Sequence, residues 1–125
     1  MDYLLDTHVI LWWFTNPKQI SNEANQIISN KENTILVSCA SLWEMSIKKS
    51  LGRLTIPRNI LGVIQSEGFK ILSIGPEESL GICDLPLIHQ DPFDRMLVMQ
   101  AKLLDLTLIT RDKNVMEYPI LTLKA

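Results

Sequence analysis

Five short apolar runs, separated by segments of helical pattern, restrict the fold of this chain more than any other feature of its sequence. Each run is too short for a core helix and has the composition of a buried strand. The expected strands are residues 3–5, 34–38, 69–74, 106–110 and 120–123. Strands that alternate with helices favour a mostly parallel sheet of about five strands, flanked by helices on both faces. We therefore expect an α/β fold.

Residues that begin or end helices delimit the segments between these strands. The expected helices are residues 8–14, 21–29, 41–51, 57–67, 76–85 and 92–104. We expect Thr7 to cap the first of them. Asp91 is expected to cap the last, because Pro92 then takes the first helical position, which tolerates a missing N–H group.

The length and composition of the chain indicate one globular domain over residues 1–125. A core of this size is still single, and with 46% hydrophobic and 21% charged residues the chain buries enough apolar surface to offset the entropy of ordering. The longest apolar stretch, residues 9–14, is far shorter than the roughly 20 residues of a transmembrane helix. Acidic residues near the N-terminus argue against a signal peptide.

Cysteine and charge content narrow the chemistry further. Cys39 and Cys83 lie in apolar segments and lack the spacing of a zinc site. We expect both to be reduced core thiols of a cytoplasmic protein. The net charge of −2 does not favour a protein that binds nucleic acid through a basic surface. Nucleic-acid binding would have to use local patches or bound cations.

Four acidic residues from distant parts of the sequence are expected at one edge of the sheet. Asp6 directly follows the first strand, and Asp112 comes two residues after the fourth. Glu44 lies in the helix after the second strand, and Asp94 in the first turn of the helix that precedes the fourth. The carboxyl ends of parallel strands share an edge, where active sites of such sheets lie. All four carboxylates can therefore point to the same place.

Each acid taken alone also has a structural explanation. Asp6 could cap the first helix. Glu44 has the capping-box spacing to Ser41 and the ion-pair spacing to Lys48. The other two could stabilise a helix N-terminus and a turn. Taken together, however, four converging carboxylates repel one another unless cations are present. Oxygen ligands suit Mg²⁺ or Mn²⁺, which can activate water and neutralise a phosphodiester.

The order of the motifs around these acids resembles PIN-domain proteins, in particular the VapC-type toxins of toxin–antitoxin pairs. The matching segments are Leu-Leu-Asp6-Thr-His, Ser41-Leu-Trp-Glu44, His89-Gln-Asp91-Pro-Phe-Asp94-Arg95 and Ile-Thr-Arg-Asp112. The resemblance spans essentially the whole chain. It implies that Asp6, Glu44, Asp94 and Asp112 form a Mg²⁺ or Mn²⁺ site for endoribonucleolytic cleavage. It also implies an RNA substrate, an antitoxin protein as partner and a homodimer.

Further residues near the expected site have both a functional and a structural interpretation. Asp91 is expected to be a helix cap rather than a ligand. The candidates for orienting carboxylates, water or phosphate are Thr7, His8, His89, Arg95, Thr110, Arg111 and Asn114. For the two histidines we favour an outward-facing position without function. A basic rim or a solvated face could be formed by Lys48, Lys49, Arg53 and Arg58.

The first helix is densely apolar. Leu11, Trp12, Trp13 and Phe14 cover more than one helical face, so they do not all fit into one small core. We expect part of this surface to contact another chain.

Two other functions compete with the nuclease. A Mg²⁺-dependent phosphatase or phosphotransfer module would use a similar sheet. A haloacid-dehalogenase-like site, however, requires Asp-x-Asp where Asp6-Thr-His stands, and a receiver-like site requires an aspartate where Ser73-Ile-Gly ends the middle strand. The second alternative, a catalytically inactive PIN-like scaffold that binds RNA, gains no support from a chain that carries all four acids.

Overall fold

A single parallel sheet forms the centre of the molecule in the computed structural model, which describes residues 1–125. Its five strands follow the order β3-β2-β1-β4-β5. They are β1 (Asp2–Leu5), β2 (Thr34–Ser38), β3 (Lys70–Leu72), β4 (Thr107–Thr110) and β5 (Thr122–Lys124). Every pair of neighbouring strands is parallel. The expected α/β fold with a parallel sheet of about five strands is confirmed.

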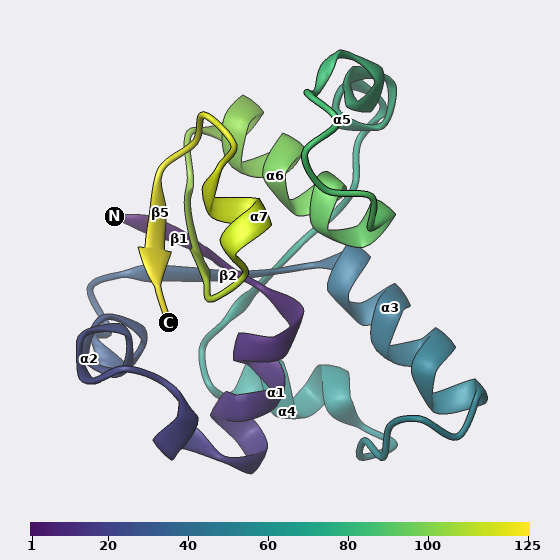
Figure 1. The fold of residues 1–125 in the computed structure, drawn as a ribbon. Coiled ribbons are helices and arrows are strands. Elements are labelled where there is room, and N and C mark those ends of the chain that lie inside the picture. Colours follow the sequence, from purple (N-terminus) through teal and green to yellow (C-terminus); the bar gives the residue numbers. More distant parts are fainter.

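Helices cover the sheet on both sides (Figure 1). The α-helices are α1 (Thr7–Thr15), α2 (Asn22–Ser29), α3 (Cys39–Ser50), α4 (Ile60–Ser66), α5 (Pro76–Gly81), α6 (Pro92–Leu104) and α7 (Lys113–Met116). Two 3₁₀ turns complete the set, η1 (Pro17–Gln19) and η2 (Ile82–Asp84). None of these helices has the length and hydropathy that crossing a membrane requires.

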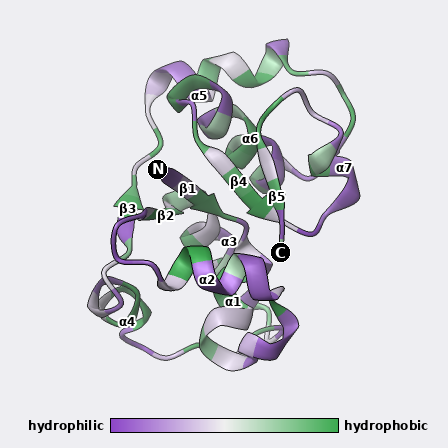
Figure 2. Cartoon of the chain, turned by 90° about the vertical axis from the view of Figure 1, so that its left-hand side faces the viewer, coloured by the Kyte–Doolittle hydropathy of each residue, from purple (hydrophilic) through white to green (hydrophobic).

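Two cores lie on opposite faces of the sheet, because successive side chains of a strand point to opposite sides. Leu5 of β1 packs in one core with residues of α1, α2 and α4, whereas the neighbouring Leu4 packs in the other core with residues of α6 and α7. Ile109 and Leu108 of β4 alternate in the same way. Green, the colour of hydrophobic residues, marks the central part of β4 and the end of β1 in Figure 2.

Two helix starts differ from those expected. The α3 helix begins at Cys39, since the Ser38 side chain accepts a hydrogen bond from the Ala40 N–H at 3.0 Å and caps it. The expected capping box at Ser41 is therefore wrong, because Ser41 lies inside the helix. Asp6, and not Thr7 as expected, caps the first helix. The backbone of Asp6 is extended and its side chain accepts a hydrogen bond from the His8 N–H, whereas Thr7 is the first residue of the helix.

Three other segments are shorter or more divided than expected. The helix expected over residues 57–67 covers only Ile60–Ser66. The segment 76–85 forms α5 and the separate 3₁₀ turn η2. The third strand covers only Lys70–Leu72. Cys83, expected in the core, is exposed.

The strand order creates a switch point at the centre of the sheet. From β1 the chain adds β2 and β3 on one side, and it then returns to add β4 and β5 on the other. The crossovers that leave β1 and β4 therefore diverge, and ligands of such sheets bind in the crevice beyond the strand ends at this point.

Candidate functional site

Asp6 and Thr110 lie side by side at the switch point. The register pairs Leu5 with Ile109, and the Asp6 N–H donates to the Ile109 carbonyl at 3.0 Å, so the residues that follow leave the sheet together. The Thr110 hydroxyl donates to Asp6 Oδ2 at 2.6 Å. Asp6 is only 4% exposed. The end of β4 thus fixes the orientation of the first predicted acid, as anticipated for Thr110.

Asp112 is held by the start of α7, a short helix that the sequence did not predict. Its Oδ1 accepts hydrogen bonds from the N–H groups of Asn114 and Val115, at 2.8 and 3.3 Å, as an N-cap. Its own N–H donates to the Thr110 hydroxyl at 3.0 Å. Thr110 therefore positions two acids, whereas Asn114 takes part through its backbone N–H.

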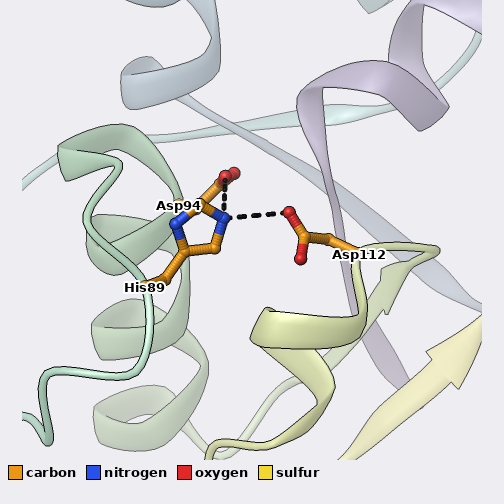
Figure 3. A group of neighbouring side chains, drawn as sticks. All are labelled: His89, Asp94 and Asp112. Atoms are coloured by element: carbon orange, nitrogen blue, oxygen red, sulfur yellow. Dashed lines mark hydrogen bonds and ion pairs between the residues drawn. The ribbon is translucent and has the colours of Figure 1, made fainter.

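His89 joins Asp112 to Asp94 (Figure 3). Its Nε2 atom lies 2.9 Å from Asp112 Oδ2 and 3.1 Å from Asp94 Oδ2. The other ring nitrogen, Nδ1, accepts from the Asp91 N–H at 3.1 Å, which fixes the ring and leaves the hydrogen on Nε2. The expectation of an outward-facing His89 is wrong, because the loop before α6 turns the ring into the cluster of acids.

Glu44 approaches the cluster from α3. Its side chain is almost fully buried, and Oε2 pairs with Lys48 Nζ at 3.0 Å, as the i,i+4 spacing predicted. The other oxygen, Oε1, is buried and has no hydrogen-bond partner. A buried carboxylate oxygen without a partner is costly unless a cation or donor meets it.

The four acids are close enough to change one another's ionisation. The pKa of Asp94 is raised to about 7, first by burial and then by the charges of Asp6, Asp91 and Glu44, against the opposing effect of His89. Burial also raises the pKa of Asp6, although its hydrogen bond from Thr110 acts in the opposite direction.

The contacts of Asp112 and His89 also shift the pKa values of these two groups. Burial would raise the pKa of Asp112, but hydrogen bonds from His89, Asn114 and Val115 outweigh it and the pKa is lowered. Burial alone would lower the pKa of His89, but the hydrogen bond to Asp112 and the charge of Asp94 raise it. The site is therefore a set of mutually repelling acids that one imidazole partly compensates.

The donor set fits a divalent cation. Ligand atoms of His89, Asp94 and Asp112 lie within 4.8 Å of one another. Each carboxylate has about four lone-pair positions, so Asp6 and Asp112 retain free ones beyond their protein hydrogen bonds. The unpartnered Oε1 of Glu44 offers a further oxygen. An open hollow of about 300 Å³ lies over Asp6 and Asp112 and gives access from solvent.

A comparison of the whole sequence with known families identifies this arrangement. The family described as PIN domain matches residues 3–121. The chain belongs to the PIN-domain family. The resemblance expected from the four acidic motifs is therefore confirmed.

This PIN domain is similar to several proteins of toxin–antitoxin systems. Ribonuclease VapC22 of Mycobacterium tuberculosis is 27% identical over 115 residues, which cover 90% of this chain and 88% of the relative. The structure of VapBC2 from Rickettsia felis bound to a promoter DNA fragment has a TM-score of 0.75 at 16% identity and covers 98% of each chain. A toxin–antitoxin complex from Klebsiella pneumoniae has a TM-score of 0.65 at 22% identity, covering 98% of this chain and 96% of the other.

Arg95 and Arg111 are neighbours of the acids in the sequence, but in the structure they contact backbone carbonyls and aromatic side chains. The Arg95 guanidinium donates to the carbonyls of Pro86, His89 and Ile82 and to the Tyr118 hydroxyl. It braces the loop that carries His89. Arg111 stacks on the Trp12 ring, 4.6 Å from its centroid, and donates to the carbonyls of Gln19 and Ala125. Neither arginine pairs with an acid.

The remaining candidate residues either make contacts that hold the PIN domain together or lie on its surface. The Thr7 hydroxyl donates to Ser41 Oγ at 2.9 Å and ties α1 to α3 without touching an acid. His8 is largely exposed, with Nδ1 4.0 Å from Asp6 Oδ1. Asp91 caps α6, as expected. In the expected basic rim, Lys48 is paired with Glu44, while the other members are exposed: Lys49, Arg53 and Arg58.

The apolar side chains of α1 pack against their own chain. Trp13 donates through Nε1 to Glu67 at 3.0 Å and packs on Phe69, and Phe14 also packs on Phe69. All four α1 residues expected in an interface are partly buried on the first core. Each of the four keeps some exposed surface, so the expected contact of α1 with another chain stays a prediction. Large exposed apolar side chains also lie on and after α3, at Trp43, Ile47 and Leu51.

Proposed function

We propose that this PIN domain is a metal-dependent endoribonuclease and the toxin of a toxin–antitoxin pair. The observation that carries the proposal is the convergence of four acids at the switch point: Asp6, Glu44, Asp94 and Asp112. The similarity to Ribonuclease VapC22 supports RNA as the substrate. The shared fold with chains of toxin–antitoxin complexes supports an antitoxin as partner.

These four acids would hold Mg²⁺ or Mn²⁺, because both ions prefer carboxylate oxygens and retain positions for water and phosphate. When bound, such an ion activates water and neutralises the phosphodiester. The residues of the chain orient the ligands. Thr110 fixes Asp6 and Asp112, and the Asp91 N–H fixes the ring of His89. His89 places an N–H donor between Asp94 and Asp112, where it limits their repulsion.

The geometry does not favour a phosphotransfer module. A phosphorylated aspartate must expose one oxygen as nucleophile. Asp6 is 4% exposed, and both of its oxygens accept hydrogen bonds, from the His8 N–H and from the Thr110 hydroxyl. It is therefore built to be a ligand rather than an attacking group.

A homodimer and an antitoxin complex would each cover apolar surface that the single chain exposes. Ile47 and Leu51 lie one turn apart on and directly after α3 and are 37% and 60% exposed. Exposed apolar side chains at this spacing are typical anchors of a partner helix or a second subunit. We therefore propose that protein partners contact this end of α3 in addition to the surface of α1.

The proposal is tested by incubating the purified protein with transfer, ribosomal and messenger RNA in Mg²⁺, Mn²⁺ or chelator. We expect cleavage with metal and none with chelator. Because water is the nucleophile, each cut should leave a phosphate monoester and a hydroxyl, without a 2′,3′-cyclic phosphate. Cleavage that persists in chelator, or cyclic products, would show that another mechanism operates. No cleavage of any RNA by folded, metal-loaded protein would contradict the nuclease assignment.

A further inference from the structure

A second cavity, of about 330 Å³, lies between α3, the segment of α5 and η2, and the start of α6. Its wall is mostly apolar and includes Trp43, Ile82, Phe93 and Met96, with the polar side chain of Gln90 at its margin. No acidic residue lines it. The nuclease chemistry proposed above uses none of these side chains.

This cavity is continuous with the carboxylate site along the chain. Three of its wall residues are direct sequence neighbours of site residues, and they come from α3, from the loop before α6 and from α6 itself. The pairs are Trp43 with Glu44, Gln90 with His89, and Phe93 with Asp94. The same backbone segments therefore carry the acids and part of the cavity wall, so a strand bound at the acids lies within a few residues' reach of the cavity.

Trp43 is suited to stacking on a flat ring. Its side chain is 61% exposed, although it belongs to the cavity wall. Phe93 packs edge-on against it, with ring centroids 5.2 Å apart and an interplanar angle of 81°, and so fixes the indole while leaving part of its surface free. Exposed aromatic faces beside a nucleic-acid backbone are the usual platforms for unpaired bases.

Gln90 supplies the polar group that a base edge requires. Its side-chain amide makes no hydrogen bond within the protein and offers both donors and an acceptor. Arg95 also lines the cavity, but its guanidinium already donates to the backbone carbonyls of Pro86, His89 and Ile82. An apolar wall with one free amide matches a nucleobase, which combines an apolar face with a hydrogen-bonding edge, better than it matches a purely aliphatic side chain of a protein partner.

We propose that this cavity binds one unpaired nucleobase of the RNA strand whose phosphate lies at the carboxylate site, with the base stacked on Trp43 and its edge near Gln90. The inference rests on the proposed nuclease function and adds a base-binding subsite to it. Trp43 is then a positioning residue that sets which phosphodiester of a flexible strand reaches the acids.

The test compares two oligomers of equal length, a short single-stranded RNA and its abasic counterpart, by fluorescence anisotropy with Ca²⁺ in place of Mg²⁺ to limit cleavage. The wild type should bind the RNA more tightly than the abasic strand. Trp43→Ala should lower the affinity for RNA about ten- to a hundredfold, the range expected for the loss of base stacking. It should leave the affinity for the abasic strand unchanged. Trp43→Phe should restore part of the loss.

Leu61→Ala is the matched control, since Leu61 is 46% exposed on α4 and lies outside the cavity. It should bind both strands like the wild type. Equal loss of RNA and abasic binding in Trp43→Ala, or no loss, would overturn the base subsite. So would unchanged RNA binding together with a changed oligomeric state in light scattering, which would assign Trp43 to a protein interface.

Cleavage assays separate this inference from the proposed function. If the wild type cleaves RNA but shows no base-dependent affinity, the subsite is wrong and the nuclease stands. If base-dependent binding requires Trp43 while no RNA is cleaved with any metal, the subsite stands and the nuclease assignment fails.

Discussion

Asp94 is the acid whose pKa depends on several other charged groups of the site. It contacts His89, and the charges of Asp6, Asp91 and Glu44 all raise its pKa in addition to its burial. A carboxyl group with a pKa of about 7 holds its proton over much of the neutral range when no cation is present. The ionisation of Asp94 therefore couples the binding of a cation at the site to the stability of the fold.

The stability of the metal-free protein should fall as the pH rises from 6 to 8. The folded-state pKa of Asp94, about 7, lies above its ordinary value of 3.8, so between these values the folded protein binds more protons than the unfolded chain. We expect a loss of about 1 kcal/mol from Asp94 over this interval, or roughly 4 °C in Tm.

Thermal unfolding in chelator at the two pH values measures this effect. The Asp94→Asn variant has no ionisable group at this position, so its Tm should differ much less between the two pH values. Asp112 does not interfere, since its lowered pKa affects stability only at much lower pH. A wild-type Tm that is equal at both pH values, or higher at pH 8, would contradict the raised pKa of Asp94.

Glu44 should contribute to metal affinity through its unpartnered oxygen. Glu44→Gln preserves the volume of the side chain but removes the charge, and we expect Mn²⁺ affinity in calorimetry to fall by at least about tenfold. Glu78 provides a matched control, because it is another buried acid, 8% exposed, on α5 outside the site. Glu78→Gln should bind Mn²⁺ like the wild type. Equal affinities of wild type and Glu44→Gln would remove Glu44 from the ligand set.

At the level of elements, strand-to-helix junctions explain why so much of the site could be predicted. Asp6 and Asp112 are both N-caps of helices that begin directly after β1 and β4. The structural interpretation of these acids is therefore confirmed, and it is compatible with their proposed role as metal ligands. A cap uses some lone pairs of the carboxylate and fixes its direction, and the remaining lone pairs point to the switch point.

The position of His89 could not be predicted, because it depends on contacts that are remote in sequence. Its loop is held by Arg95 and by the Tyr118 hydroxyl, which accepts from the His89 N–H at 2.9 Å and comes from the segment after α7. The sequence gives no periodic signal for such a loop. The contacts of Trp12 and Trp13 could not be predicted for a related reason, since their partners, Arg111 and Phe69, lie in distant segments.

The N-cap of α6 should matter more for stability than for catalysis. Asp91 Oδ1 accepts hydrogen bonds from the N–H groups of Phe93 and Asp94 at 2.8 and 3.2 Å. Asp91→Ala should therefore cost about 1 kcal/mol, or roughly 4 °C in Tm. Well below the Tm, its RNA cleavage should exceed that of Asp94→Asn.

Asp91→Asn serves as the control, since asparagine caps helices as well as aspartate does. It should retain both Tm and cleavage. If Asp91→Asn abolished cleavage while its Tm was unchanged, Asp91 would belong to the ligand set rather than to the helix.

For the whole molecule, the strand order determines where the chemistry takes place. Because β1 and β4 are neighbours whose crossovers diverge, four segments between residues 6 and 112 meet at one crevice. The alternation of apolar runs predicted the parallel sheet, but only the paired strands define this crevice. A net charge of −2 is compatible with RNA binding if the acids are neutralised by a cation at the same place.

RNA cleavage by wild type and Asp6→Asn at matched Mn²⁺ concentration tests the four-acid nuclease site most directly. Asp6→Asn keeps the shape of the side chain and removes one repelling charge, so its Tm in chelator should equal or exceed that of the wild type. Its cleavage rate should fall by at least about a hundredfold, and chelator should stop the wild type. Equal cleavage by a folded Asp6→Asn variant would contradict the assignment of these acids to catalysis.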